Sequence, residues 1–77
     1  MTTEKRLFEL VDDRSSKFWE VWTEGVRLCT RYGKIGSAGQ TTTKDESSAD
    51  AATRALEKLV KEKTGKGYKE TVANHAV

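Results

Sequence analysis

The stretch KFWEVWT, residues 17–23, decides the fold class. Its aromatic and β-branched side chains are typical of a β-strand, in which successive side chains point to opposite faces. Trp19 and Trp22 must therefore lie on opposite faces, and a sheet covered on one side can bury only one of them in its main core. We expect the C-terminal return of the chain through Tyr68 to cover the other ring. An exposed stacking platform is the alternative.

The segments on either side of this stretch predict an antiparallel meander. Residues 6–11 alternate in the same way, and the Asp and Ser residues of 12–16 are typical of a turn. Residues 26–32 form a third alternating segment, with Arg27 and Arg31 on one face and Tyr32 on the other. Three glycines then interrupt the pattern, and the Thr-rich residues 40–44 predict a fourth strand.

The period of the apolar residues changes from two to nearly four after Ser48, which predicts a helix over residues 50–63. A serine can cap the first free N–H groups, Asp50 suits the positive end of the helix dipole, and we expect Gly65 to end the helix. The apolar stripe of this helix consists of Ala52, Ala55, Leu56, Leu59 and Val60.

With 77 residues the chain has room for one compact core. We therefore predict the α+β class: a small antiparallel β-meander sheet of about four to five strands, packed on one C-terminal α-helix. Residues 1–70 form the single domain, with Tyr68 as an apolar anchor. Residues 71–77 lack a pattern and are expected to be a disordered tail.

The inventory of reactive side chains argues against an enzyme. The one cysteine, Cys29, cannot form an internal disulfide, and the one histidine, His75, falls in the predicted tail. We therefore expect no metal, no cofactor, no catalytic residues and an unreactive Cys29. No stretch has the length of a membrane span or the pattern of a signal peptide, so we expect a cytoplasmic monomer with no membrane partner.

Basic residues are concentrated in one segment. Residues 26–44 hold four basic side chains and no acidic one, whereas residues 1–25 hold six acidic and four basic side chains and residues 45–77 hold six of each. The four are Arg27, Arg31, Lys34 and Lys44. This segment also contains the glycine-rich loop, so it combines cations, a flat ring at Tyr32 and flexible backbone. Nucleic-acid binding requires these features, although a solvated hairpin with ordinary surface charges has them too.

Four blocks of sequence resemble the WGR domain family in their order and spacing. They are residues 17–22 (KFWEVW), 30–36 (TRYGKIG), 39–40 (GQ) and 62–68 (EKTGKGY). The family includes domains of poly(ADP-ribose) polymerases, bacterial regulators related to molybdate metabolism, and short bacterial proteins that consist of little else, which this chain resembles. The resemblance implies a sheet packed on one helix.

The resemblance also implies a site. In the polymerases the Trp-Gly-Arg signature contacts a DNA end and neighbouring domains, and the matching residues here are Tyr32, Gly33 and Lys34. Tyrosine keeps a flat face, but lysine lacks the planar fork with which arginine holds phosphate. Glu46 is a second departure, because relatives usually carry a bulky apolar residue just before the helix.

Two functions remain open from the sequence. The first is a nucleic-acid-binding module that contacts DNA backbone or strand ends through the RYGKIG hairpin. The second is an adaptor that uses the same hairpin and an exposed aromatic residue to bind a partner protein in trans. Tyr32 is either a stacking residue or simply a buried ring of its strand face. The predicted nucleic-acid-binding residues are Arg27, Arg31, Tyr32, Gly33, Lys34, Gln40 and Lys44.

Overall fold

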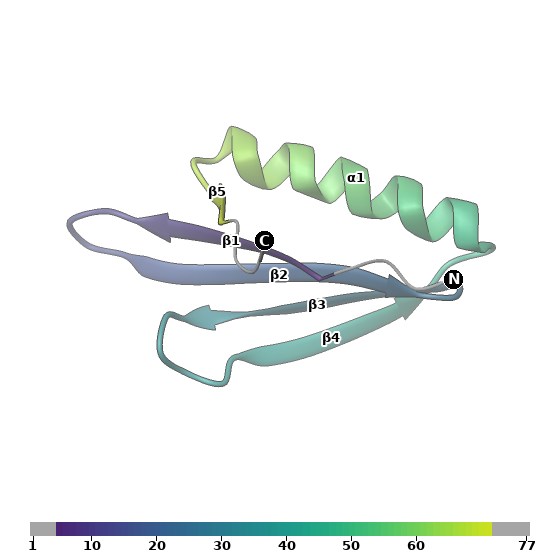
Figure 1. Ribbon diagram of the computed structural model, residues 1–77, viewed down its shortest axis with the longest axis horizontal. Helices are drawn as coiled ribbons and strands as arrows, with labels where there is room; N and C mark the ends of the chain where they lie inside the picture. Colours follow the sequence, from purple (N-terminus) through teal and green to yellow (C-terminus); the bar gives the residue numbers. More distant parts are fainter. Residues whose placement is uncertain (1–4, 72–77) are drawn as a thin grey trace, which may run out of the picture.

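The computed structural model describes residues 5–71, and in this part of the chain five strands form one antiparallel sheet in the order β4-β3-β2-β1-β5. One helix, α1, covers one face of the sheet (Figure 1). The predicted α+β class, with a meander and one C-terminal helix, is confirmed. The elements are β1 (Arg6–Val11), β2 (Ser16–Glu24), β3 (Arg27–Lys34), β4 (Gln40–Asp45), α1 (Ala49–Gly65) and β5 (Lys69–Thr71).

The main core lies between the sheet and α1. Phe8 and Trp19 are directly opposite each other on β1 and β2, and their ring centroids are 5.4 Å apart. Val21 and Leu28 extend this apolar surface, and Leu56 of α1 packs onto it. Burial of such side chains contributes roughly 1.5–3 kcal/mol each, which makes this cluster the main source of the fold's stability. Partly buried residues at its rim are Ala55, Leu59, Val60 and Tyr68.

Local sequence explains both ends of α1. Ser48 is the N-cap, and its Oγ accepts a hydrogen bond of 3.0 Å from the N–H of Ala51. The C-terminal end differs from the prediction, because Gly65 is still helical and the reversal occurs at Gly67, whose φ is +108°. The N–H of Tyr68 donates to the carbonyl of Lys63, which is the bond that typically closes a helix through a glycine at this position.

Trp19 and Trp22 lie on opposite faces, as the alternation predicted, and Trp22 is the one on the face away from α1, but neither expectation for the ring outside the main core is correct. Tyr68 packs against the core on the helix side, so it does not cover Trp22. Trp22 is not an exposed platform either, because only 7% of it is accessible. The Lys5 ammonium lies 4.6 Å from the ring centroid, and the indole N–H donates to Glu24 at 2.9 Å.

The predicted boundary at residue 70 is also corrected. Lys69–Thr71 forms β5 beside β1, with Thr71 opposite Leu7, so the tail does not begin at Thr71. Arg6 holds this short strand in place through two hydrogen bonds to the Glu70 carboxylate, at 2.8 and 2.7 Å. Residues 72–77, including His75, lie outside the described residues.

Leu56→Ala is expected to lower the free energy of unfolding by about 2–5 kcal/mol, because it leaves a cavity in the core beneath α1. Lys58→Ala, on the exposed side of the same helix, is the control and should change it by less than about 0.5 kcal/mol. Urea unfolding followed by circular dichroism measures both. A similar loss in the two variants would contradict the assigned core face of α1.

Glu70→Gln is expected to lower stability at neutral pH by less than about 1 kcal/mol, because the Arg6–Glu70 pair is partly solvent-screened. Hydrogen bonds from Arg6 lower the pKa of Glu70. The pair therefore stabilises the fold above the unfolded-state value of about 4.3, and this contribution is lost as the pH falls through the lower folded-state pKa. Unfolding measured from neutral to acid pH should show the two proteins converging. A stability gap that persisted in acid would exclude this linkage.

Candidate functional site

The seven residues predicted to bind nucleic acid do not form one surface. Strand register places Arg27 and Arg31 on the face opposite α1, as their alternation predicted, and the other side chains of the set on the face toward α1. That second group consists of Tyr32, Lys34, Gln40 and Lys44. Gly33, between the two groups, contributes no side chain. A flat ligand on one face of the sheet cannot contact both groups.

Both arginines are already paired with acidic side chains. Arg27 Nε lies 3.3 Å from the Asp45 carboxylate. Arg31 Nε donates to Glu20 at 3.0 Å and Nη1 donates to the Ala38 carbonyl at 2.7 Å. The Arg31 guanidinium also lies 4.7 Å from the centroid of the Phe18 ring. Arg31 therefore links the β3–β4 hairpin to β2, and Glu20 largely compensates its charge.

Arg27 and Lys44 are also distant from the glycine-rich hairpin. They lie on opposite faces of the sheet, at the end of β3 and β4 away from the hairpin. Arg27 and Lys34 are seven residue steps apart along β3, which is about 23 Å at 3.3 Å per residue. Lys44 Nζ lies 4.0 Å from Glu46. The Glu46 side chain is mostly buried beside Lys44, and the backbone N–H of Glu46 donates to the Val26 carbonyl at 2.8 Å. Glu46, which stands where relatives usually carry an apolar residue, thus has Lys44 as a cationic neighbour.

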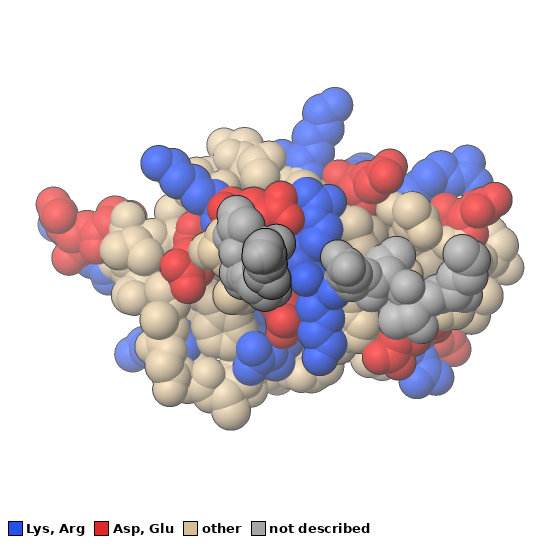
Figure 2. Space-filling view, in the orientation of Figure 1, with Lys and Arg blue, Asp and Glu red and all other residues tan. Residues whose placement is uncertain are grey.

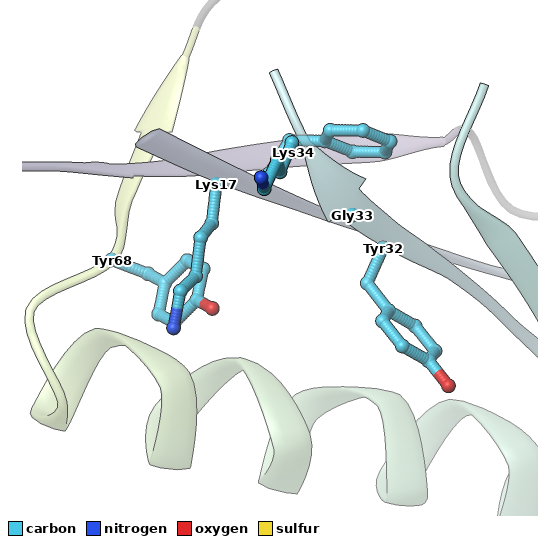
Figure 3. Close-up of a pocket in the computed structure, with 6 residues that line it drawn as sticks. Lys17, Tyr32, Gly33, Lys34 and Tyr68 are labelled. Atoms are coloured by element: carbon cyan, nitrogen blue, oxygen red, sulfur yellow. The ribbon is translucent and has the colours of Figure 1, made fainter. Parts of the chain in front are cut away.

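The end of the sheet that carries Lys34 and the β3–β4 hairpin is hollowed. Two depressions lie where the β1–β2 turn and the β3–β4 hairpin come together, and we call this region the strand-end surface. The first has a volume of about 340 Å³ and the second about 310 Å³. Lys17, Phe18, Tyr32, Gly33, Lys34 and Tyr68 line the first (Figure 3); Arg14, Ser15, Ser16, Lys17, Lys34 and Ile35 line the second.

Lys17 and Lys34 belong to both depressions. They are directly opposite each other on β2 and β3, on the face toward α1. Like charges in such a cross-strand pair repel each other. Among the described residues neither lysine forms an ion pair, and no carboxylate lines either depression. Two lysines without an acidic partner in the lining make the strand-end surface suitable for a negatively charged ligand.

Two aromatic rings accompany these cations. In Figure 3 the side chains of Lys17 and Tyr32 extend from the sheet toward the helix, and the ring of Tyr68, from the segment after α1, lies beside Lys17. Tyr32 is 40% exposed, so it is not simply a buried ring of its strand face. Lys63 Nζ lies 5.4 Å from the centroid of Tyr68 and adds a further cation near the first depression. The site can therefore offer both charge and a flat apolar face.

The glycines of the hairpin are required by packing. Gly39 has a φ of +75°, and a Cβ there would lie 2.6 Å from Phe18 Cζ. A Cβ on Gly33 would lie 2.9 Å from the Cα of Gly39. The hairpin also closes locally, because the N–H and Oγ of Ser37 both donate to the Lys34 carbonyl at 3.0 and 2.7 Å. These contacts hold Lys34 and Ile35 at the tip of the sheet.

Sequence reasoning missed Arg14, Lys17 and Tyr68 as site residues. Each lies outside residues 26–44, the segment with the basic surplus. Cross-strand pairing brings Lys17 opposite Lys34, and the turn after α1 brings Tyr68 to the same depression. Figure 2 shows basic and acidic side chains interspersed over the face in view.

The remaining chemical groups do not form another site. Cys29 is 2% exposed, and burial raises the pKa of its thiol, which keeps it in the less reactive protonated form. Within residues 5–71 no group of three or more His, Cys, Asp or Glu side chains could hold a metal ion. No helix in the same range is long and apolar enough to cross a bilayer.

Comparison with known proteins identifies a family. The WGR domain model matches residues 4–75. In Escherichia coli (strain K12), the uncharacterized protein YfeS is 38% identical over 66 residues (86% of this chain, 27% of the relative), and protein YehF is 39% identical over 72 residues (94% and 26%). A crystal structure of a Bacteroides fragilis protein superposes with a TM-score of 0.87 at 46% identity, covering 90% of this chain and 20% of that one. The chain thus spans about a quarter of the length of the curated relatives.

Gly39→Ala is expected to destabilise the fold by more than about 2 kcal/mol, because it adds a clash with Phe18 to the cost of a positive φ. Gly36→Ala is the matched control, since Gly36 also has a positive φ but a Cβ there meets nothing within 4 Å. Thermal unfolding of both variants separates the two costs. Equal losses in the two variants would show that contact with Phe18 does not constrain the hairpin.

Proposed function

The chain belongs to the WGR domain family, and from this premise we propose that it is a non-enzymatic nucleic-acid-binding module whose contact region is the strand-end surface. The observation that carries the proposal is the pair of adjacent depressions that share Lys17 and Lys34. Their lining includes three cations and two tyrosines and no carboxylate. Phosphate binding needs the cations, and contact with a base or sugar needs the flat rings.

The family resemblance supports the same location. Tyr32, Gly33 and Lys34, which occupy the positions of the family signature, line the first depression together with Lys17 and Tyr68. Gln40 is the cross-strand neighbour of Tyr32 and can add a polar contact at the rim. The proposal leaves out Arg27, Arg31 and Lys44, because their charges are paired or lie on another face or at the other end of the sheet.

The binding chemistry is electrostatic and independent of base identity. Arg14, Lys17 and Lys34 can neutralise about three phosphates, for which the logarithm of the affinity should fall with the logarithm of salt concentration with a slope of roughly −2 to −3. The described residues contain one helix, and it packs along the sheet without projecting from it (Figure 1). This arrangement offers no recognition helix for a major groove.

Lys34→Ala is expected to weaken binding of a short labelled DNA by about fivefold or more, to the same extent for different sequences, and to make the salt slope shallower by roughly one. Lys44→Ala is the matched control, because it removes an exposed lysine on the same sheet face at the far end. Fluorescence anisotropy at several salt concentrations measures both. An unchanged affinity for Lys34→Ala, or an equal loss for Lys44→Ala, would contradict the proposed location.

A second candidate function is binding of a partner protein in trans. It is favoured by Tyr32 and Ile35, each 40% exposed at the hairpin, since exposed aromatic and apolar side chains are typical of the centres of protein interfaces. Such binding would depend little on salt. A purified partner that bound with the same affinity at low and moderate salt, together with no binding of DNA or RNA at low salt, would favour this function over the first.

A further inference from the structure

We propose that the nucleic acid enters the strand-end surface as an unpaired strand, with one base in the first depression and an adjoining phosphate in the second. This inference rests on the proposed function and specifies its ligand. It follows from the arrangement of two depressions of different chemistry side by side, linked by Lys17 and Lys34. Every unpaired strand likewise carries a base next to a phosphate, so the two depressions match two neighbouring groups of the ligand.

The first depression suits the ring of a base. Tyr32 and Tyr68 both line it, and Tyr32 keeps 40% of its surface exposed. Its volume of about 340 Å³ is at the lower end of the range for sites that enclose a small molecule, which fits one nucleoside better than a base pair. Stacking of a base on an aromatic ring is tolerant of sequence, so it agrees with a site that has no recognition helix.

The second depression suits a phosphate. Arg14, Lys17 and Lys34 supply positive charge, and Ser15 and Ser16 supply hydroxyl donors. The nearby carboxylate of Asp12 is turned to its own backbone, because its Oδ1 accepts hydrogen bonds from the N–H groups of Arg14 and Ser15 at 2.8 and 2.7 Å. This bonding shapes the β1–β2 turn and keeps the acidic group out of the lining.

The need for a base face selects unpaired nucleic acid. In a duplex the rings are stacked between neighbouring pairs, and only backbone and groove edges are accessible along its length. Residues of β2 and β3 and Tyr68, which follows α1, line the first depression, and Tyr32 extends from the sheet on the side that carries α1 (Figure 3). An unpaired strand can turn one base into this space, whereas the interior of a duplex would first have to open.

Three probes of equal length test the proposal by fluorescence anisotropy at moderate salt: an oligothymidylate, an abasic strand with the same phosphates and no bases, and a blunt duplex. We expect the oligothymidylate to bind roughly fivefold to a hundredfold more tightly than the abasic strand, which is the effect of one base–aromatic stack, and more tightly than the duplex. Equal affinity for all three would overturn base insertion and leave the proposed function standing.

Tyr32 variants test the position of the base. Tyr32→Leu keeps an apolar side chain on β3 and removes the aromatic face, so it should weaken oligothymidylate binding about fivefold or more and reduce the preference for oligothymidylate over the abasic strand. Tyr32→Phe keeps the ring and should bind as the unaltered protein does. Circular dichroism verifies that both remain folded. Unchanged oligothymidylate binding by Tyr32→Leu would overturn the assigned stacking residue.

The remaining outcomes are also decisive. Tighter binding of the duplex than of the oligothymidylate would overturn the unpaired-strand proposal and indicate a duplex backbone or end as ligand. Absence of binding to all three probes at low salt would overturn the proposed function itself, and with it this inference. The two failures are therefore distinguishable in one set of titrations.

Discussion

Burial of β2 on both of its faces is the constraint on which the rest of the structure depends. Trp19 points toward α1 and packs against Phe8, and the core cluster that they form with Leu56 holds the helix onto the sheet. The preceding residue in the chain, Phe18, points to the opposite face, where Arg31 covers its ring and Gly39 approaches it closely. Two adjacent aromatic residues thus fix two separate parts of the molecule, the helix layer and the hairpin. Because the hairpin carries Tyr32 and Lys34, packing around β2 also positions the candidate site.

Local pattern was sufficient to predict β1 to β4 and α1, but not β5. Alternation in residues 17–23 and 26–32 correctly placed Trp19 and Trp22 on opposite faces and Tyr32 on the face opposite Arg31, and the serine before the helix correctly predicted its cap. These features depend on residues close together in sequence. The reversal of the chain at Gly67, after α1 ends, depends on hydrogen bonds between residues close in sequence, but the sequence offers Gly65 and Gly67 as alternatives for it.

Features that depend on pairing between distant segments were not predictable. The separation of Arg27 and Lys44 from Lys34 follows from strand length and register, and the pairing of Arg31 with Glu20 follows from cross-strand contact. The apposition of Lys17 and Lys34 has the same origin. Counting charge along the chain therefore located a basic segment. The strand-end surface, which combines cations with aromatic rings, is instead formed by residues of the β1–β2 turn, the β3–β4 hairpin and Tyr68 after α1. The physical basis of the site is this convergence at one end of the sheet.

An amide NMR titration of the isotopically labelled protein with a short oligonucleotide, at low and moderate salt, tests the central claim most directly. The account predicts salt-sensitive shifts concentrated in residues 14–17, 32–35 and 68, with residues 27 and 44 at the other end of the sheet little changed. Shifts centred on residues 27 and 44, or spectra unchanged at low salt, would contradict the assignment of nucleic-acid binding to the strand-end surface.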